Sequence, residues 1–261
     1  GCIGLAASIA VIGVDAFCIE PHWLTVEHVT LRSSELEDAV RLAVVADIQT
    51  DHPGPYERRV LQRVLEEDPD LILLAGDYIQ QGDPDRYREA GERLRRIMEE
   101  VGLDAPMGVY AVQGNVDWPG EWEQIFSGLR VTSVDQSRTM DLGQMTLTAL
   151  SLRDSADTRL SIPAVEGFHV VMGHVPNFAR GTVEADLLIA GHTHGGQVQL
   201  PPIGPLLTLA DVPRDWASGI TEIAPGKTLI VSRGIGMERG YAPRFRFLCR
   251  PQLVIVDLKP S

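Results

Sequence analysis

The sequence predicts an α/β fold in which two facing sheets carry helices on their outer sides. Three apolar runs, LAVVAD (42–47), LILLAGD (71–77) and GVYAVQGN (108–115), are typical of strands that are buried on both faces. Between them, residues 56–67 and 84–101 place apolar side chains at helical spacing. This alternation of strand and helix predicts a parallel half of an α/β domain.

The second half of the chain differs, because short strand-like runs follow one another with few helices between them. These runs are 129–134, 145–151, 168–172, 186–190, 197–200, 228–232 and 252–257. They predict a second mixed or antiparallel sheet packed against the first. The whole of residues 40–258 is then one domain.

Composition indicates a globular protein without a disulfide framework. Hydrophobic residues make up 44% of the 261 residues, and the three cysteines form no CxxC pair. Acidic residues outnumber basic ones by 36 to 23, a net charge of -13 that keeps the protein soluble and disfavours nucleic acid as a partner. A site for phosphate compounds would need local positive charge, which bound metal ions supply.

The N-terminal segment 1–20 is expected to be a membrane anchor or signal-like segment. Residues 1–14 are all apolar or small, and Asp15 ends the run. Fourteen residues are fewer than the about 20 that span a bilayer, but the sequence begins with Gly1, so residues missing upstream are an open question. The alternative is a core helix, which should show polar positions at helical period. A membrane-associated protein is expected, with the side of the membrane open.

Polar side chains follow five of the expected strands. They are Asp47, Asp77, Asn115, His174 and the pair His192 and His194. Ligands in open α/β sheets bind at the carboxyl ends of strands, so these side chains should meet in one crevice. Carboxylate, amide and imidazole groups without thiolate are the ligand types for Zn, Mn or Fe.

Taken singly, each of these residues has a simpler interpretation. A Gly-Asp pair after a strand is usually a turn, and a lone histidine is usually structural. However, a glycine directly precedes four of them, Asp77, Asn115, His174 and His192, and allows a sharp bend there. The combination of all six in this order favours a metal site over coincidence.

The same residues carry a resemblance to a known family. Their order, with GHTHGGQVQLP (191–201), resembles that of the calcineurin-like metallophosphoesterases over residues 41–257. VSRGIG (231–236) and RFLCRPQLVIVDL (246–258), together with the apolar N-terminus, are similar to its membrane-anchored bacterial branch.

The resemblance implies a four-layer αββα sandwich and a dinuclear hydrolase of phosphate esters or pyrophosphates. Asp77 would bridge two divalent ions (Mn, Zn, Fe or Mg), Asp47 and His194 would hold the first, and Asn115, His174 and His192 the second. The catalytic core would be Asp77, Asn115 and His174. Such a pair of ions shares a hydroxide and clamps phosphoryl oxygens. The substrate would be a phosphate-containing small molecule or a lipid-linked compound.

One departure from the family motif is Gln49, where the pattern Asp-x-His has histidine. Gln49 could bind the first metal through its amide oxygen, which favours a harder ion such as Mn or Mg. Alternatively, Asp51 or His52 takes its place.

A second departure is Val116, where the motif Gly-Asn-His has a histidine that assists protonation of the leaving group. General acid catalysis contributes about 10² to 10⁴ in rate. We therefore expect activity to favour good leaving groups, such as aryl esters or phosphoanhydrides, unless Asp117 or His52 supplies the proton.

Two further hypotheses stay open at this stage. Arg233, Arg239, Arg244 and Arg246, with Tyr241, Phe245 and Phe247 among them, form a basic stretch that either contacts phosphate or lipid headgroups or lies in a solvated loop and an edge strand. The lost histidines could also mark a catalytically impaired metal-binding pseudoenzyme. Six of the usual eight positions survive, which favours the enzyme.

Overall fold

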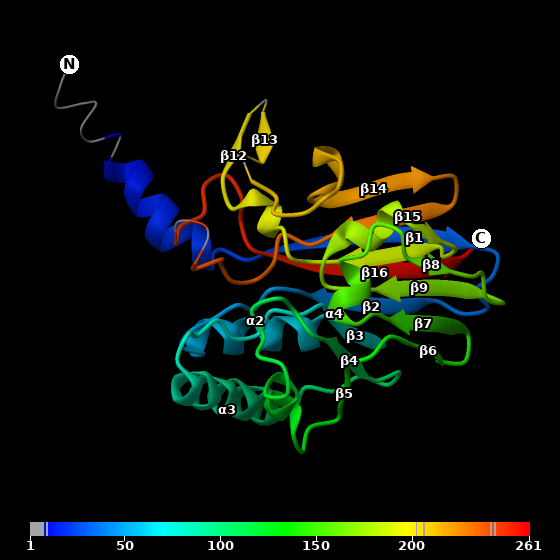
Figure 1. Cartoon of the computed structure of the whole chain (residues 1–261), viewed down its shortest axis with the longest axis horizontal. Helices are drawn as coiled ribbons and strands as arrows, with labels where there is room; N and C mark the ends of the chain where they lie inside the picture. Colours follow the sequence, from blue (N-terminus) through cyan, green and yellow to red (C-terminus); the bar gives the residue numbers. More distant parts are fainter. Residues whose placement is uncertain (1–7, 9, 202, 206, 241, 243) are drawn as a thin grey trace.

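The computed structural model describes residues 8, 10–201, 203–205, 207–240, 242 and 244–261, and two six-stranded sheets form its centre (Figure 1). The first sheet has the order β1 (Thr25–Ser33), β16 (Gln252–Pro260), β2 (Val40–Val45), β3 (Leu71–Leu74), β4 (Val109–Val112) and β5 (Val131–Val134). Strands β2 to β5 are parallel, whereas β16 runs antiparallel to β2.

The second sheet is also mixed. Its order is β14 (Gly219–Ala224), β15 (Lys227–Val231), β11 (Leu187–Ala190), β9 (Phe168–Met172), β7 (Met145–Ala149) and β6 (Arg138–Asp141). Two short ribbons accompany it, β8 (Ser161–Ile162) with β10 (Thr182–Val183), and β12 (Gln199–Leu200) with β13 (Gly204–Pro205). The parallel strands β7, β9, β11 and β15 are its centre.

Two helices, α2 (Pro55–Glu66) and α3 (Pro84–Val101), cover the outer face of the first sheet (Figure 1). Their apolar stripes, among them Val60 and Leu94, pack with the sheet residues Val45 and Ile72. Helix α3 starts where the Asp83 side chain accepts a hydrogen bond from the Arg86 N–H, with Pro84 at its first position.

The two sheets bury a second apolar layer between them. Leu42 and Val44 of the first sheet pack there against Leu147, Val170 and Ile189 of the second. Because the central strands are covered on both faces, their sequences read as continuous apolar runs rather than as alternating ones.

The outer face of the second sheet carries a thinner layer. A short helix, α4 (Leu152–Ser155), and a 3-10 turn at Pro176–Arg180 lie on it, and Phe178 packs there among Val171 and Leu188. The arrangement is therefore helices, sheet, sheet and short helical turns, which confirms the predicted αββα sandwich.

The first sheet extends beyond the expected range 40–258. Strand β1, from Thr25 to Ser33, pairs in parallel with the full length of β16. Its sequence TVEHVTLRS mixes charged and apolar residues, and only Val29 is buried, so its apolar pattern is weak. Strands β6 and β14 were missed for the same reason, since each lies at a sheet edge.

The expected anchor, residues 1–20, is only partly covered, because residues 1–7 and 9 lie outside the described residues. Residues 10–14 are helical, continue through Asp15–Ile19, and extend away from the sheets in Figure 1. The carbonyl of Ala16 accepts a hydrogen bond from the Arg246 N–H, and Phe17 contacts the ring of Phe245. Within the described part of the chain, we find no helix with the length and apolar character needed to cross a bilayer.

The described arginines of the basic stretch differ in their surroundings, since Arg244 is exposed to solvent and Arg246 is not. Arg246 is fully buried and donates hydrogen bonds to the carbonyl groups of Arg233, Gly234, Gly236 and Cys249. Its guanidinium thus satisfies backbone acceptors of the 233–249 loop and is closed to any phosphate. Tyr241, also noted in this stretch, lies outside the described residues.

Candidate metal centre

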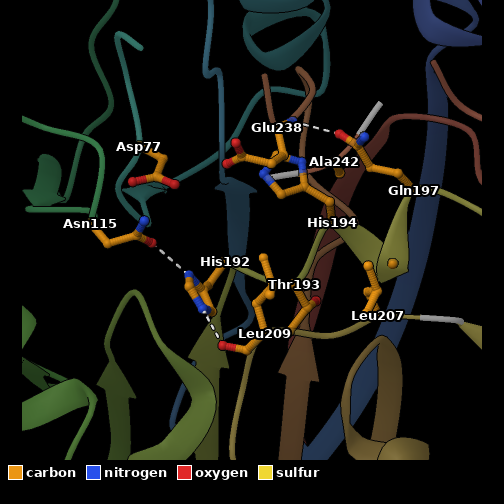
Figure 2. Close-up of a pocket in the computed structure, with 11 residues that line it drawn as sticks. Asp77, Asn115, His192, Thr193, His194, Gln197, Leu207, Leu209, Glu238 and Ala242 are labelled. Atoms are coloured by element: carbon orange, nitrogen blue, oxygen red, sulfur yellow. Dashed lines mark hydrogen bonds between the residues drawn. The ribbon is translucent and has the colours of Figure 1, made fainter. Parts of the chain in front are cut away.

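Loops after β3, β4 and β11 line one cavity of about 210 Å³ together with the segments that follow β13 and β15. Its lining residues are Asp77, Asn115, His192, Thr193, His194, Gly196, Gln197, Leu207, Leu209, Glu238 and Ala242. Figure 2 shows Asp77 and Asn115 on one side and Gln197 on the other, with Glu238 and the rings of His192 and His194 between them.

The backbone is strained at the candidate ligands. Positive φ angles occur at Asp47 (50°), Gln49 (35°), Asp77 (56°), His192 (70°) and His194 (50°). Residues with a Cβ rarely adopt this conformation, and each instance costs of the order of 1 to 3 kcal/mol. Such a concentration of strained residues among the candidate ligands is typical of a functional site.

Glycine lets the loops approach one another closely. A Cβ on Gly114 would lie 2.1 Å from the backbone nitrogen of Asp77, and one on Gly191 would lie 2.7 Å from Oδ2 of Asp47. The glycines that precede Asn115 and His192 are therefore needed for contact between loops, not only for a bend.

Backbone N–H groups fix the two carboxylates. Asp47 accepts hydrogen bonds from the His192 N–H at 2.9 Å and 3.1 Å, and Asp77 accepts one from the Val116 N–H at 2.9 Å. Both side chains are buried, with exposures of 0% and 1%. Each carboxylate is thus oriented by a loop from another strand.

Asp117 joins the loops after β3 and β4. Its carboxylate accepts hydrogen bonds from the N–H groups of Asp77, Tyr78 and Gly114. Burial and the charge of Asp77 raise the pKa of this carboxyl to about 7. Even so, both carboxylate oxygens of Asp117 face backbone N–H groups, so this residue holds the loops in place. It does not face the cavity, where it could replace the general acid that is missing at Val116.

His174 is completely buried between the two carboxylates. Its Nδ1 faces the Ala75 carbonyl at 2.8 Å, so Nε2 faces Oδ2 of Asp77 at 3.4 Å and Oδ1 of Asn115 at 2.9 Å. Burial disfavours the charged imidazole, but Asp77 and Asp47 outweigh it and raise the pKa to about 9. A cation is therefore favoured at this point.

Asn115 and His192 lie nearer to the solvent. The Asn115 side chain is exposed, and its Oδ1 lies 2.6 Å from Nδ1 of His192. The other ring nitrogen of His192 lies 2.9 Å from the carbonyl of Leu209. These two polar groups can contact both a metal ion and a substrate at the cavity mouth.

The residues present fit a metal. Both ring nitrogens of His194 and Oε1 of Gln49 are buried and have no hydrogen-bond partner among the described residues. Burial lowers the pKa of His194 well below its usual value, which keeps the ring neutral as a metal ligand must be. Unpaired buried polar atoms cost about 1 to 3 kcal/mol each, and coordination would offset this cost.

Two groups of side chains could each hold an ion. The ligand atoms of Asp77, His174 and His192 lie within 4.8 Å of one another, and so do those of Asp47, Asp77 and His194. Asp77 belongs to both groups. The structure therefore brings together the carboxylates and histidines that the sequence singled out.

The residues considered as replacements for Gln49 lie elsewhere. Asp51 forms ion pairs with Arg239 at 3.0 Å and Arg244 at 3.3 Å. His52 is exposed and contacts Arg93. Neither lines the cavity, and His52 is likewise not placed to replace the lost acid near Val116.

Glu238 is a cavity residue that the sequence did not reveal. It is only 6% exposed, and Figure 2 shows its carboxylate directed into the cavity. It accepts hydrogen bonds from the side chains of Gln49 and Gln80. A glutamate in the loop sequence GMERG does not directly follow a strand and matches no motif, so no sequence signal marks it.

Comparisons with known proteins agree with this site. The family model described as calcineurin-like phosphoesterase matches residues 40–196, more than half of the chain. The uncharacterized metallophosphoesterase YkuE of Bacillus subtilis is 29% identical, with 93% of this chain and 88% of the relative covered. An uncharacterized metallophosphoesterase of Aquifex aeolicus is 28% identical, with 92% of this chain and 94% of the relative covered. The phosphodiesterase YaeI of Escherichia coli is 24% identical, with 74% of this chain and 72% of the relative covered.

The raised pKa of His174 predicts a pH dependence for the metal-free protein. A folded-state pKa of about 9, above the usual value of about 6.5, stabilises the fold fully below pH 6.5. This contribution is lost as pH rises towards 9. We expect the melting temperature of EDTA-treated protein to fall between pH 6.5 and 9, measured by circular dichroism.

The variant His174→Gln should flatten that slope, while His28→Gln, at an exposed histidine, should leave it unchanged. A melting temperature that stays constant or rises over the same range in the unsubstituted protein would contradict the electrostatic account.

Proposed function

The chain belongs to the calcineurin-like phosphoesterase family, and we propose that it hydrolyses phosphate esters or anhydrides with two divalent metal ions bound in this cavity. Family membership supports a metal-dependent phosphoesterase. The observation that carries the dinuclear proposal is that Asp77 belongs to two groups of side chains. Within each group, the ligand atoms lie within 4.8 Å of one another.

The proposed ligands divide between two sites. The first metal site consists of Asp47, Gln49, Asp77 and His194, and the second consists of Asp77, Asn115, His174 and His192. Bound there, divalent ions supply Lewis-acid activation of the phosphoryl group and lower the pKa of water. Their charge also offsets the repulsion between phosphate and a chain of net charge -13.

The chain's own residues orient these groups. Because the Ala75 carbonyl accepts the Nδ1 proton of His174, Nε2 faces Asp77 and Asn115, and on loss of its proton this nitrogen would be the atom available to a metal ion. Asn115 and His192, at the cavity mouth, are the side chains placed to touch a substrate phosphate together with the ions. In this proposal, Asp77, Asn115 and His174 form the catalytic core.

A phosphodiester or a phosphoanhydride is the proposed kind of substrate. The E. coli relative is named a phosphodiesterase, which supports diesters. Val116 places no proton donor beside Asn115, and neither Asp117 nor His52 faces the cavity. Good leaving groups, which depart without protonation, are therefore favoured.

The metal content of the purified protein tests the dinuclear site. After incubation with Mn²⁺ or Zn²⁺, elemental analysis should find about two ions per chain. Asp77→Asn should lower the metal content and reduce hydrolysis of bis(4-nitrophenyl) phosphate by at least about 10³-fold, because one side chain serves both ions.

The matched control is Asp85→Asn, at a side chain that is 94% exposed. Two bound ions with no hydrolysis of any aryl or anhydride substrate would instead favour the pseudoenzyme, and binding of fewer than two ions would contradict the dinuclear site.

Val116→His tests the leaving-group hypothesis. Restoring an imidazole should speed hydrolysis of alkyl phosphodiesters by about 10- to 100-fold, and leave aryl diesters within about 3-fold. The measurement is the rate across a series of diesters of different leaving-group pKa. The native protein should show a steep dependence and the variant a shallower one; a shallow dependence in the native protein would refute the hypothesis.

We also propose that the segment 1–20 associates with a membrane and that a lipid-linked phosphate compound is the natural kind of substrate. Val11 and Phe17 of this segment are 69% and 58% exposed. Leu207 and Leu209, which line the cavity, are 57% and 54% exposed. Apolar side chains so exposed lose unfavourable contact with water when they enter a lipid interface.

Co-sedimentation with phosphatidylcholine vesicles tests this proposal. The protein should sediment with the vesicles, and the double variant Val11→Glu and Phe17→Glu should reduce the bound fraction by about 10-fold or more. The control is Arg138→Glu, at an exposed position of the edge strand β6. Val131 would not serve as a control position, because its side chain packs against the core. Equal sedimentation of the native protein and the double variant would argue against the proposal.

A further inference from the structure

Glu238 and Gln80 fix the side-chain amide of Gln49. The Gln49 Nε2 donates to Oε2 of Glu238 at 2.7 Å and to Oε1 of Gln80 at 3.2 Å. Gln49 has an exposure of 0% and Glu238 of 6%, so these bonds are shielded from water. They join the loops that follow β2 and β3 to the loop that follows β15.

The orientation of the Gln49 amide follows from groups whose roles are unambiguous. The backbone N–H of Arg239 donates to Oε1 of Gln80 at 2.9 Å, so Nε2 of Gln80 faces Glu238 and donates to its Oε1 at 3.0 Å. An ionised carboxylate only accepts hydrogen bonds, so Glu238 must also face the NH₂ side of Gln49. Flipping the Gln49 amide would place its oxygen against two acceptors.

This orientation leaves Oε1 of Gln49 buried and without a hydrogen-bond partner among the described residues. A network that served only to join three loops would have no reason to leave that acceptor unsatisfied, at a cost of about 1 to 3 kcal/mol. Gln49 also follows Asp47 by two residues, and both have positive φ angles. Oε1 of Gln49 is therefore an oriented, buried acceptor that a metal ion could occupy.

We propose that Glu238 is a positioning residue that holds the Gln49 amide with its oxygen towards the first metal site, in place of the imidazole found in the family motif. This inference rests on the proposed function, since it assumes that an ion binds there. The arrangement replaces a nitrogen donor with an oxygen donor backed by a carboxylate. Such a site favours Mn²⁺ or Mg²⁺ over Zn²⁺ relative to a histidine site.

The experiment is a double-mutant cycle on metal affinity, measured by calorimetric titration of the metal-free protein with Mn²⁺. The variants are Glu238→Gln, Gln49→Met and both together, and Glu222→Gln, at an exposed glutamate, is the control. His194→Asn identifies which binding step belongs to the first site. Circular dichroism establishes that each variant is folded.

We expect Glu238→Gln to weaken the first-site step by about 10- to 100-fold, the usual effect of removing a partner that orients a ligand. The second-site step should change by less than about 3-fold, which a general loss of structure would not allow. Combined with Gln49→Met, the substitution should add no further loss, because no amide oxygen remains to be oriented.

Three results would overturn the inference. The Mn²⁺ affinity could be unchanged in Glu238→Gln, or it could fall equally at both sites. The losses of affinity in Glu238→Gln and Gln49→Met could also add in the double variant, which would indicate that Glu238 binds the ion directly. These results differ from failure of the proposed function, in which the native protein itself would bind no pair of ions.

Discussion

The burial of two carboxylates beside each other is the constraint on which the rest of the structure depends. Asp47 and Asp77 are both almost inaccessible to water, and burial together with the charge of Asp77 raises the pKa of Asp47 to about 7. Positive charge must lie between them, and His174 provides it when its ring is protonated. Divalent ions bound by neutral histidines would provide it more fully, so binding of metal would release protons.

The fold makes this burial possible because rigid strands deliver each group. Loops from both sheets meet at one edge, and a glycine such as Gly114 lets one loop lie directly against Asp77. Positive φ angles at the candidate ligands show that packing, rather than local preference, sets their conformation. Glu238 and Ala242 also line the site, and the buried Arg246 donates hydrogen bonds to the carbonyl groups of Arg233 and Gly236 nearby in the sequence.

Much of the sandwich and the candidate ligands could be predicted from the sequence, because strands covered on both faces leave continuous apolar runs and the polar residues follow them directly. Edge strands such as β1 could not be predicted as securely, since they are half solvated. Glu238 was missed because its role depends on a contact with Gln49, 189 residues away. The burial of Arg246 could not be predicted, because sequence alone does not show that backbone carbonyls surround it. The membrane anchor stays a prediction.

Anomalous diffraction from crystals of the protein loaded with Mn²⁺ tests the central claim most directly. The account predicts two peaks about 4 Å apart or less, on either side of Asp77, one next to His194 and the other next to His174 and His192. A single peak, or peaks that do not share Asp77, would contradict it.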